Sequence, residues 1–122
     1  MTRKRRVIAD YLRDILEATE AMREFLAPVS SQAQFKGDRK TVYAVVRAFE
    51  LMGEATKSIP TSFRRRHPGV PWREMAGMRD KVIHEYFGVD MAVLWKTATE
   101  DVPAVREAIR TILESESDGS LL

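Results

Sequence analysis

Apolar side chains recur along most of this chain at the three- and four-residue spacing of an amphipathic helix. A first block extends for about five turns, from residue 8 to residue 26, and the segment "SSQAQFKGD" then interrupts it. Asp38 is suited to cap a second helix, with an apolar face that continues to about Ile59. The inner positions expected in these two helices are Ile8, Tyr11, Leu12, Ile15, Ala18, Met22, Phe25, Leu26, Val42, Val45, Val46, Phe49, Met52 and Ile59.

The second half of the chain predicts two further helices. "IPTSFRRRHPGVPW" holds three prolines and a glycine, which indicates a loop with at most a short helix. A third long helix should begin between residues 72 and 74 and end near Phe87, with Asp90 as the next N-cap. The last apolar pattern includes the pair Val93 and Leu94 and continues to Leu113, and Pro103 should kink or break it.

No segment alternates between apolar and polar residues for long enough to form a strand, and no internal repeat is present. The pattern therefore predicts an all-α fold, an antiparallel bundle of four to five helices. Residues 1–122 should form a single domain, with a frayed acidic tail from about residue 114. Trp72 and Trp95 are interpreted as core anchors.

Composition removes several classes of site. The chain has no cysteine, which excludes disulfides and thiolate metal ligands, and two histidines are too few for a histidine-built metal site. We therefore expect no metal and no cofactor. No apolar run approaches the roughly 20 residues of a membrane span, and no apolar block follows the basic start, so we expect a soluble, cytoplasmic protein without membrane contact.

The charge balance leaves nucleic-acid binding open. The net charge is +2, from 20 basic and 18 acidic residues. The basic residues cluster at positions 3–6 and at Arg64, Arg65 and Arg66, which could contact RNA phosphates or form a solvated loop. His67 follows this second cluster and is expected to be exposed.

The candidate chemistry lies in "RDKVIHEYF", which holds Arg79 and His84. An arginine can hold a phosphate and a histidine can move protons near neutral pH, a pairing that suits metal-free cleavage of RNA by its own 2′-hydroxyl. Residues five apart on a helix lie about 140° from each other, so one straight helix would not bring both to one phosphate. Either the helix ends or distorts near His84, or two copies of the chain pool their residues, and we expect the second. By spacing alone, a structural role for the pair is the more common case.

Two carboxylates could support this pair. Asp80 lies one helical turn before His84 and could accept a hydrogen bond from the imidazole. Glu54 belongs to a polar stripe with Arg47, Glu50 and Lys57, which by itself indicates only solvated ion pairs.

Several motifs, in order, resemble the HepT-like branch of the HEPN superfamily, the toxins that pair with minimal nucleotidyltransferases. The similar segments cover at least half of the chain and are "RAFELMGEATKSIP", "HPGVPWREMAGMRDKVIHEYFGVD" and "LWKTATEDVPAVREAI". The resemblance implies a HEPN-like homodimer with its cleft between two protomers. It also implies a metal-independent endoribonuclease that leaves a 2′,3′-cyclic phosphate and a 5′-hydroxyl.

The family pattern of arginine, four residues, histidine, one residue and tyrosine falls on Arg79, His84 and Tyr86. By resemblance, His84 is the acid and base, Arg79 stabilises the charged phosphate, and Glu54 of the "GEA" motif supports the site. Tyr86 would accept AMP from a MntA-like nucleotidyltransferase antitoxin, although it could also be a structural tyrosine at a helix end. Asp80 departs from the asparagine that very often follows the family's arginine. It would raise the pKa of His84 but also repel a phosphate.

The leading hypothesis is therefore a toxin ribonuclease, acting on tRNA or mRNA and silenced by adenylylation of Tyr86. The main alternative is a non-catalytic helical module that binds a nucleotide or serves a nucleotidyltransferase as an accessory subunit. A plain dimerisation module is a third, weaker option. The intact pair of Arg79 and His84 favours the first hypothesis, because a binding module has no need to move protons.

Overall fold

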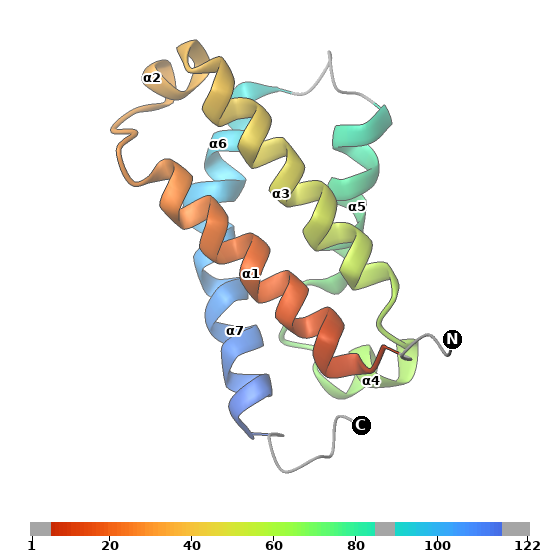
Figure 1. The fold of residues 1–122 in the computed structure, drawn as a ribbon. Helices are drawn as coiled ribbons and strands as arrows, with labels where there is room; N and C mark the ends of the chain where they lie inside the picture. The colour runs from red at the N-terminus through yellow and green to blue at the C-terminus, as the bar shows by residue number, and fades with distance from the viewer. Residues whose placement is uncertain (1–5, 85–89, 116–122) are drawn as a thin grey trace, which may run out of the picture.

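The computed structural model describes residues 6–84 and 90–115, except for the side chains of residues 83 and 84. Four long helices form an antiparallel bundle, and the described residues contain no strand (Figure 1), so the predicted all-α class is confirmed. The long helices are α1 (Ile8–Leu26), α3 (Arg39–Lys57), α5 (Trp72–His84) and α7 (Val102–Ser115). Shorter helices connect them: α2 (Gln32–Gly37), α4 (Thr61–Arg66) and α6 (Met91–Lys96).

Helices α1 and α3 lie side by side at the front of the bundle in Figure 1. Most of the predicted inner positions are buried, with Leu12, Ile15 and Phe49 fully inaccessible. Phe25 is different: it is 39% exposed and lines the groove between α1 and α3 together with Ala44 and Ala48. The interior placement that was predicted for Phe25 is therefore wrong.

Asp38 caps α3 as predicted. Its carboxylate accepts hydrogen bonds from the backbone N–H of Thr41 at 3.1 Å and from the Thr41 hydroxyl at 2.6 Å. The hydroxyl bond, followed by the backbone bond, lowers the pKa of Asp38.

The segment before Asp38 is not a plain interruption, because it contains α2. Ser31 caps this helix by accepting a hydrogen bond from the backbone N–H of Gln34 at 3.1 Å. Phe35 is fully buried, with its ring centroid 5.4 Å from that of Trp95, which packs against the core and is only partly buried. A single buried apolar residue in six gives no helical period, which explains why the pattern missed α2.

Trp72 joins α4 to α5 and is a core anchor, as predicted. It is 6% exposed, and its indole N–H donates to the carbonyls of Arg64 at 3.1 Å and His67 at 2.9 Å. These bonds satisfy carbonyls at the C-terminal end of α4. His67 is partly buried rather than exposed, because its ring lies 4.7 Å from the ring of Phe63.

Pro103 disturbs the last helical segment as predicted. A π-helical turn, η2 (Thr97–Asp101), lies between α6 and α7, and the N–H of Val102 donates to Thr97 five residues back. Since proline has no N–H and its ring collides with the carbonyl four residues earlier, a wider turn in front of it relieves the clash. In α6, Leu94 is buried whereas Val93 is 40% exposed, so only one residue of the predicted inner pair faces the core.

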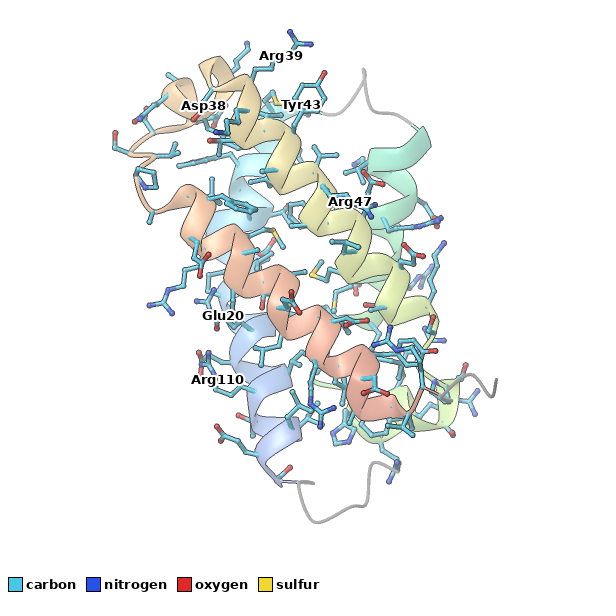
Figure 2. All side chains as sticks on the ribbon, in the orientation of Figure 1. Glu20, Asp38, Arg39, Tyr43, Arg47 and Arg110 are labelled. Carbon is cyan, nitrogen blue, oxygen red and sulfur yellow. The ribbon has the colours of Figure 1, made fainter. Side chains whose placement is uncertain are left out.

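Helix α7 is tied to α1 by charged side chains (Figure 2). Glu20 accepts a hydrogen bond from Arg110 at 2.6 Å and lies 3.8 Å from Arg106. The helix extends to Ser115, so the first two residues of the predicted frayed tail are helical, and residues 116–122 lie outside the described part. Within the described part, no helix is long and apolar enough to cross a membrane.

Candidate functional site

The candidate site is built on an unusually close contact between α3 and α5. A Cβ atom placed on Gly53 would lie 2.1 Å from the Cβ of Arg79 and 2.9 Å from the carbonyl oxygen of Met75. No side chain, not even a methyl group, fits at position 53 without moving α5. Gly53 therefore sets the position of Arg79.

Arg79 lies at the rim of this contact. Its side chain is 29% exposed, and its Nη1 donates to Oδ1 of Asp80 at 3.3 Å. Its Nε is buried and has no hydrogen-bond partner among the described residues. The guanidinium therefore keeps donor capacity beyond its bond to Asp80.

Asp80 also connects the two helices. Its Oδ1 accepts a hydrogen bond from Nζ of Lys57, the last residue of α3, at 2.5 Å. The bond from Lys57, and then that from Arg79, lowers the pKa of Asp80. We refer to Lys57, Arg79 and Asp80 as the α3/α5 charge cluster. Two cations share one carboxylate in it, so the cluster has a surplus positive charge that attracts an anion.

The predicted contact between Asp80 and His84 is not among those described. The described partners of the Asp80 carboxylate are Lys57 and Arg79, and the side chain of His84 lies outside the described residues. Tyr86 also lies outside them. His84 is the last residue of α5, so its backbone lies about 7.5 Å beyond that of Arg79 along the helix axis.

Glu54 occupies a different face of α3 from Gly53. It is exposed and lines a groove of about 600 Å³ between α1 and α3, together with Arg47 and Leu51. Successive helical residues are rotated by about 100°, so Glu54 points away from the contact that Gly53 makes with α5. The supporting role of Glu54 stays a prediction. The residue of the "GEA" motif that meets Arg79 is its glycine.

The predicted polar stripe of α3 divides into two parts. Arg47 and Glu50 form the expected surface ion pair, with 3.5 Å between Nη1 and Oε2. Lys57 instead reaches across to Asp80 on α5. The sequence identified Lys57 only as a member of the stripe, because spacing within one helix carries no information on a partner in another.

The three arginines of α4 form a separate basic surface. Arg65 and Arg66 are exposed, whereas Arg64 is partly buried and its Nη2 donates to the Thr61 hydroxyl at 3.3 Å. Arg64 and Arg65 line a hollow of about 550 Å³ together with Arg73 of α5. The hollow contains neither Arg79 nor Asp80 in its lining, so a role for α4 in binding RNA stays a prediction.

Comparison with known proteins gives one consistent result. The family model described as "Ribonuclease HepT-like" matches residues 15–112. The "Probable ribonuclease HepT" of Thermococcus cleftensis is 56% identical over 97 residues, which are 80% of this chain and 87% of that protein. "Putative RNase TTE0752" of Caldanaerobacter subterraneus subsp. tengcongensis is 42% identical over 106 residues, 87% of this chain and 94% of the relative. "Putative RNase MJ1380" of Methanocaldococcus jannaschii is 39% identical over 108 residues, 88% and 98% of the two chains. No solved structure matches.

Proposed function

Because the chain belongs to the HepT-like ribonuclease family, we propose that it is a metal-independent endoribonuclease with Arg79 and His84 as its catalytic residues. The observation that carries the proposal is the α3/α5 charge cluster. It places a partly exposed guanidinium at a close contact between two helices. A guanidinium held in this way can bind the non-bridging oxygens of a phosphodiester and stabilise the charge that develops on them.

The proposed reaction needs only proton transfers and charge stabilisation. The imidazole of His84 takes the proton from a 2′-hydroxyl, and the resulting oxygen attacks the adjacent phosphorus. The bond from phosphorus to the 5′-oxygen breaks, and a histidine returns a proton to that oxygen. One strand then ends in a 2′,3′-cyclic phosphate and the other begins with a 5′-hydroxyl, so atoms and charge balance.

We propose that the working unit is a homodimer whose cleft lies between two protomers. Arg79 and His84 are five residues apart on α5, so their backbone positions lie about 140° from each other around the helix axis. A second copy lets the arginine of one protomer and the histidine of its partner act on one phosphate. Size-exclusion chromatography with light scattering should give twice the chain mass of 14.0 kDa, and a persistent monomer would contradict the shared cleft.

The proposed regulation is adenylylation of Tyr86 by a MntA-like nucleotidyltransferase antitoxin. Tyr86 follows His84 by two residues, so an adenylate there would bring negative charge close to the residues that bind the RNA phosphate. Co-expression with such an enzyme should add whole AMP units to the intact mass, and Tyr86→Phe should lose them. An unchanged mass would mean that the antitoxin acts by binding alone.

Cleavage is tested with purified protein in EDTA and with tRNA or mRNA labelled at each end. His84→Ala and Arg79→Ala should lose cleavage and should no longer arrest growth on expression. Arg13→Ala is the control: it removes an exposed arginine of α1 and should leave activity unchanged. Equal cleavage by His84→Ala would remove the nuclease proposal. RNA or nucleotide binding without cleavage by the unmodified protein would favour the non-catalytic module.

A further inference from the structure

An arginine, a tyrosine and a second arginine lie in line on the outer surface of α3. Arg39, Tyr43 and Arg47 are spaced by four residues, which places them on one side of the helix about 6 Å apart along its axis (Figure 2). We refer to these three residues as the α3 crest. Tyr43 is 46% exposed, which is unusual for a side chain of its size. None of the three takes part in the α3/α5 charge cluster.

The two arginines of the α3 crest are placed for different contacts. The guanidinium carbon of Arg39 lies 5.4 Å from the centroid of the Tyr43 ring, and its Nη2 donates to the Tyr43 hydroxyl at 3.3 Å. Arg47 has a side chain that is 62% exposed, and it pairs with Glu50 at 3.5 Å. An exposed pair of this kind is worth about 0–1 kcal/mol, so a phosphate can compete with Glu50 for Arg47.

We propose that the α3 crest binds single-stranded RNA, with one base stacked on the Tyr43 ring and the flanking phosphates held by Arg39 and Arg47. Aromatic side chains between cationic ones bind single strands in this way, because every base has a stacking face and every linkage has a charge. The two arginines are about 12 Å apart along the helix axis, which leaves room for a base between two phosphates. The inference rests on the proposed ribonuclease function and identifies part of its substrate-binding surface.

The α3 crest ends at the same height in the bundle as the proposed catalytic residues. Helices α3 and α5 are antiparallel and touch where Gly53 meets Arg79. Residues after Arg79 on α5 are therefore level with residues before Gly53 on α3. His84 comes five residues after Arg79 and Arg47 six residues before Gly53, so both lie at similar height in the bundle, although Arg47 lies about 120° around α3 from Gly53, on the side that faces the groove with α1.

Negative charges further along α3 limit how far an RNA strand could follow this helix. Beyond Arg47, the outer surface of α3 carries Glu50 and Glu54, whose carboxylates repel an RNA backbone. A strand bound along the α3 crest is therefore favoured to leave the helix at Arg47 rather than to continue down it.

A second copy of the chain is a less suitable occupant of the α3 crest. Tyr43 is its only apolar side chain, and an arginine flanks it on either side. Two identical copies that met here across a twofold axis would bring like charges together, whereas an RNA strand supplies the opposite charge.

Binding can be measured without cleavage in the His84→Ala protein. The probe is a fluorescent twelve-nucleotide oligouridine, and the readout is its anisotropy at several salt concentrations. Tyr43→Leu should weaken binding about 5-fold or more, whereas Tyr43→Phe, which keeps the ring, should bind as the parent does. Arg39→Gln with Arg47→Gln should reduce the slope of log affinity against log salt by about 1.4, since each phosphate contact on a single strand contributes about 0.7.

Arg13→Gln is the matched control for Arg47→Gln. Arg13 is 64% exposed and pairs with Asp10 three residues away at 3.3 Å, much as Arg47 pairs with Glu50, but it lies on α1. Its loss should leave the salt slope unchanged. An equal loss for both variants would mean that only net charge matters and would overturn the specific site.

Two results would show that the α3 crest does not bind RNA, and neither depends on whether the nuclease proposal is correct. If Tyr43→Leu binds oligouridine as tightly as its parent while His84→Ala abolishes cleavage, the α3 crest is wrong and the nuclease proposal stands. If Tyr43→Leu converts a dimer into a monomer in light scattering, a second copy occupies the surface, which also overturns the inference.

Discussion

Gly53→Ala is the most direct test of how the contact between α3 and α5 supports the candidate site. The added methyl group would start 2.1 Å from the Cβ of Arg79, and carbon atoms in contact need about 3.5 Å. The helices must therefore separate by about 1.4 Å at this point or shift along each other. The backbone of α5 is also in the way, because the carbonyl oxygen of Met75 would be only 2.9 Å from the methyl group, so a side-chain rotation cannot relieve the clash.

The expected change in the free energy of unfolding of Gly53→Ala combines two opposing effects. Overpacking of this kind costs about 1–3 kcal/mol, and the better helix propensity of alanine returns about 1 kcal/mol. The net loss of about 0–2 kcal/mol should lower Tm by up to about 10 °C in a domain of this size. Activity should fall further, by about 100-fold, because a shift of about 1 Å moves Arg79 from its place and pulls Asp80 away from Lys57.

Gly77→Ala is the matched control. Gly77 lies within α5, and a Cβ atom there would have nothing within 4 Å. That variant should therefore gain about 0.5–1 kcal/mol and keep full activity. Thermal unfolding by circular dichroism and cleavage of an end-labelled RNA measure the two effects. If Gly53→Ala behaved like Gly77→Ala in both assays, the close contact would not hold the site, and the reasoning would be refuted.

Three further predictions concern other contacts. Trp72→Phe removes the N–H that donates to the two carbonyls near the end of α4, and it should cost about 0.5–1.5 kcal/mol in denaturant unfolding, because each carbonyl still accepts from a backbone N–H, that of His67 or Val70. Glu20→Gln weakens the surface contact to Arg110 and should change stability by less than about 1 kcal/mol; a larger loss would mean that charged pairs, rather than the core, hold α7 on α1. The pKa of Asp80 is lowered in the folded protein, so its contribution to stability is present above its ordinary value of 3.8 and is lost as the pH falls below that value. The difference in Tm between the protein and Asp80→Asn should accordingly shrink as the pH falls below that ordinary value.

The sequence predicted the long helices well because each of them buries a continuous apolar stripe. Asp38 and Asp90 were predicted as N-caps because an aspartate directly before an apolar helical pattern can accept a hydrogen bond from a free backbone N–H of the first turn. Both carboxylates accept the expected backbone hydrogen bonds. The prediction was wrong where a residue's environment depends on distant segments. Phe25 and Val93 have the right spacing to be buried, but Phe25 lines the open groove between α1 and α3, and Val93 is 40% exposed. The spacing of apolar residues shows which face of a helix a side chain is on, but it does not show which element packs against that face.

The sequence predicted Arg79 and Asp80 as candidate site residues, but it did not predict their contacts with α3. A glycine in the middle of a helix costs about 1 kcal/mol relative to alanine, so Gly53 already indicated a close approach of another backbone. The sequence interpretation gave weight to the charged Glu54 beside it, and the structure places Glu54 on the other groove. The pairing of Lys57 with Asp80 could not have been predicted, because the two residues are 23 positions apart and nothing in their local pattern connects them.

This pairing resolves the difficulty that Asp80 raised in the sequence. A carboxylate beside the arginine that is proposed to bind phosphate should weaken the binding of RNA, whereas the family resemblance implies an uncharged asparagine at that position in many members. Lys57 supplies one positive charge within hydrogen-bond distance of Asp80, which cancels the charge that the carboxylate adds. The α3/α5 charge cluster therefore keeps a net charge of about +1, from two cations and one carboxylate, whereas an asparagine at position 80 would leave the cluster at about +2. The aspartate also gains a bond to each helix, so the arrangement that neutralises it fixes Arg79 against α3 as well.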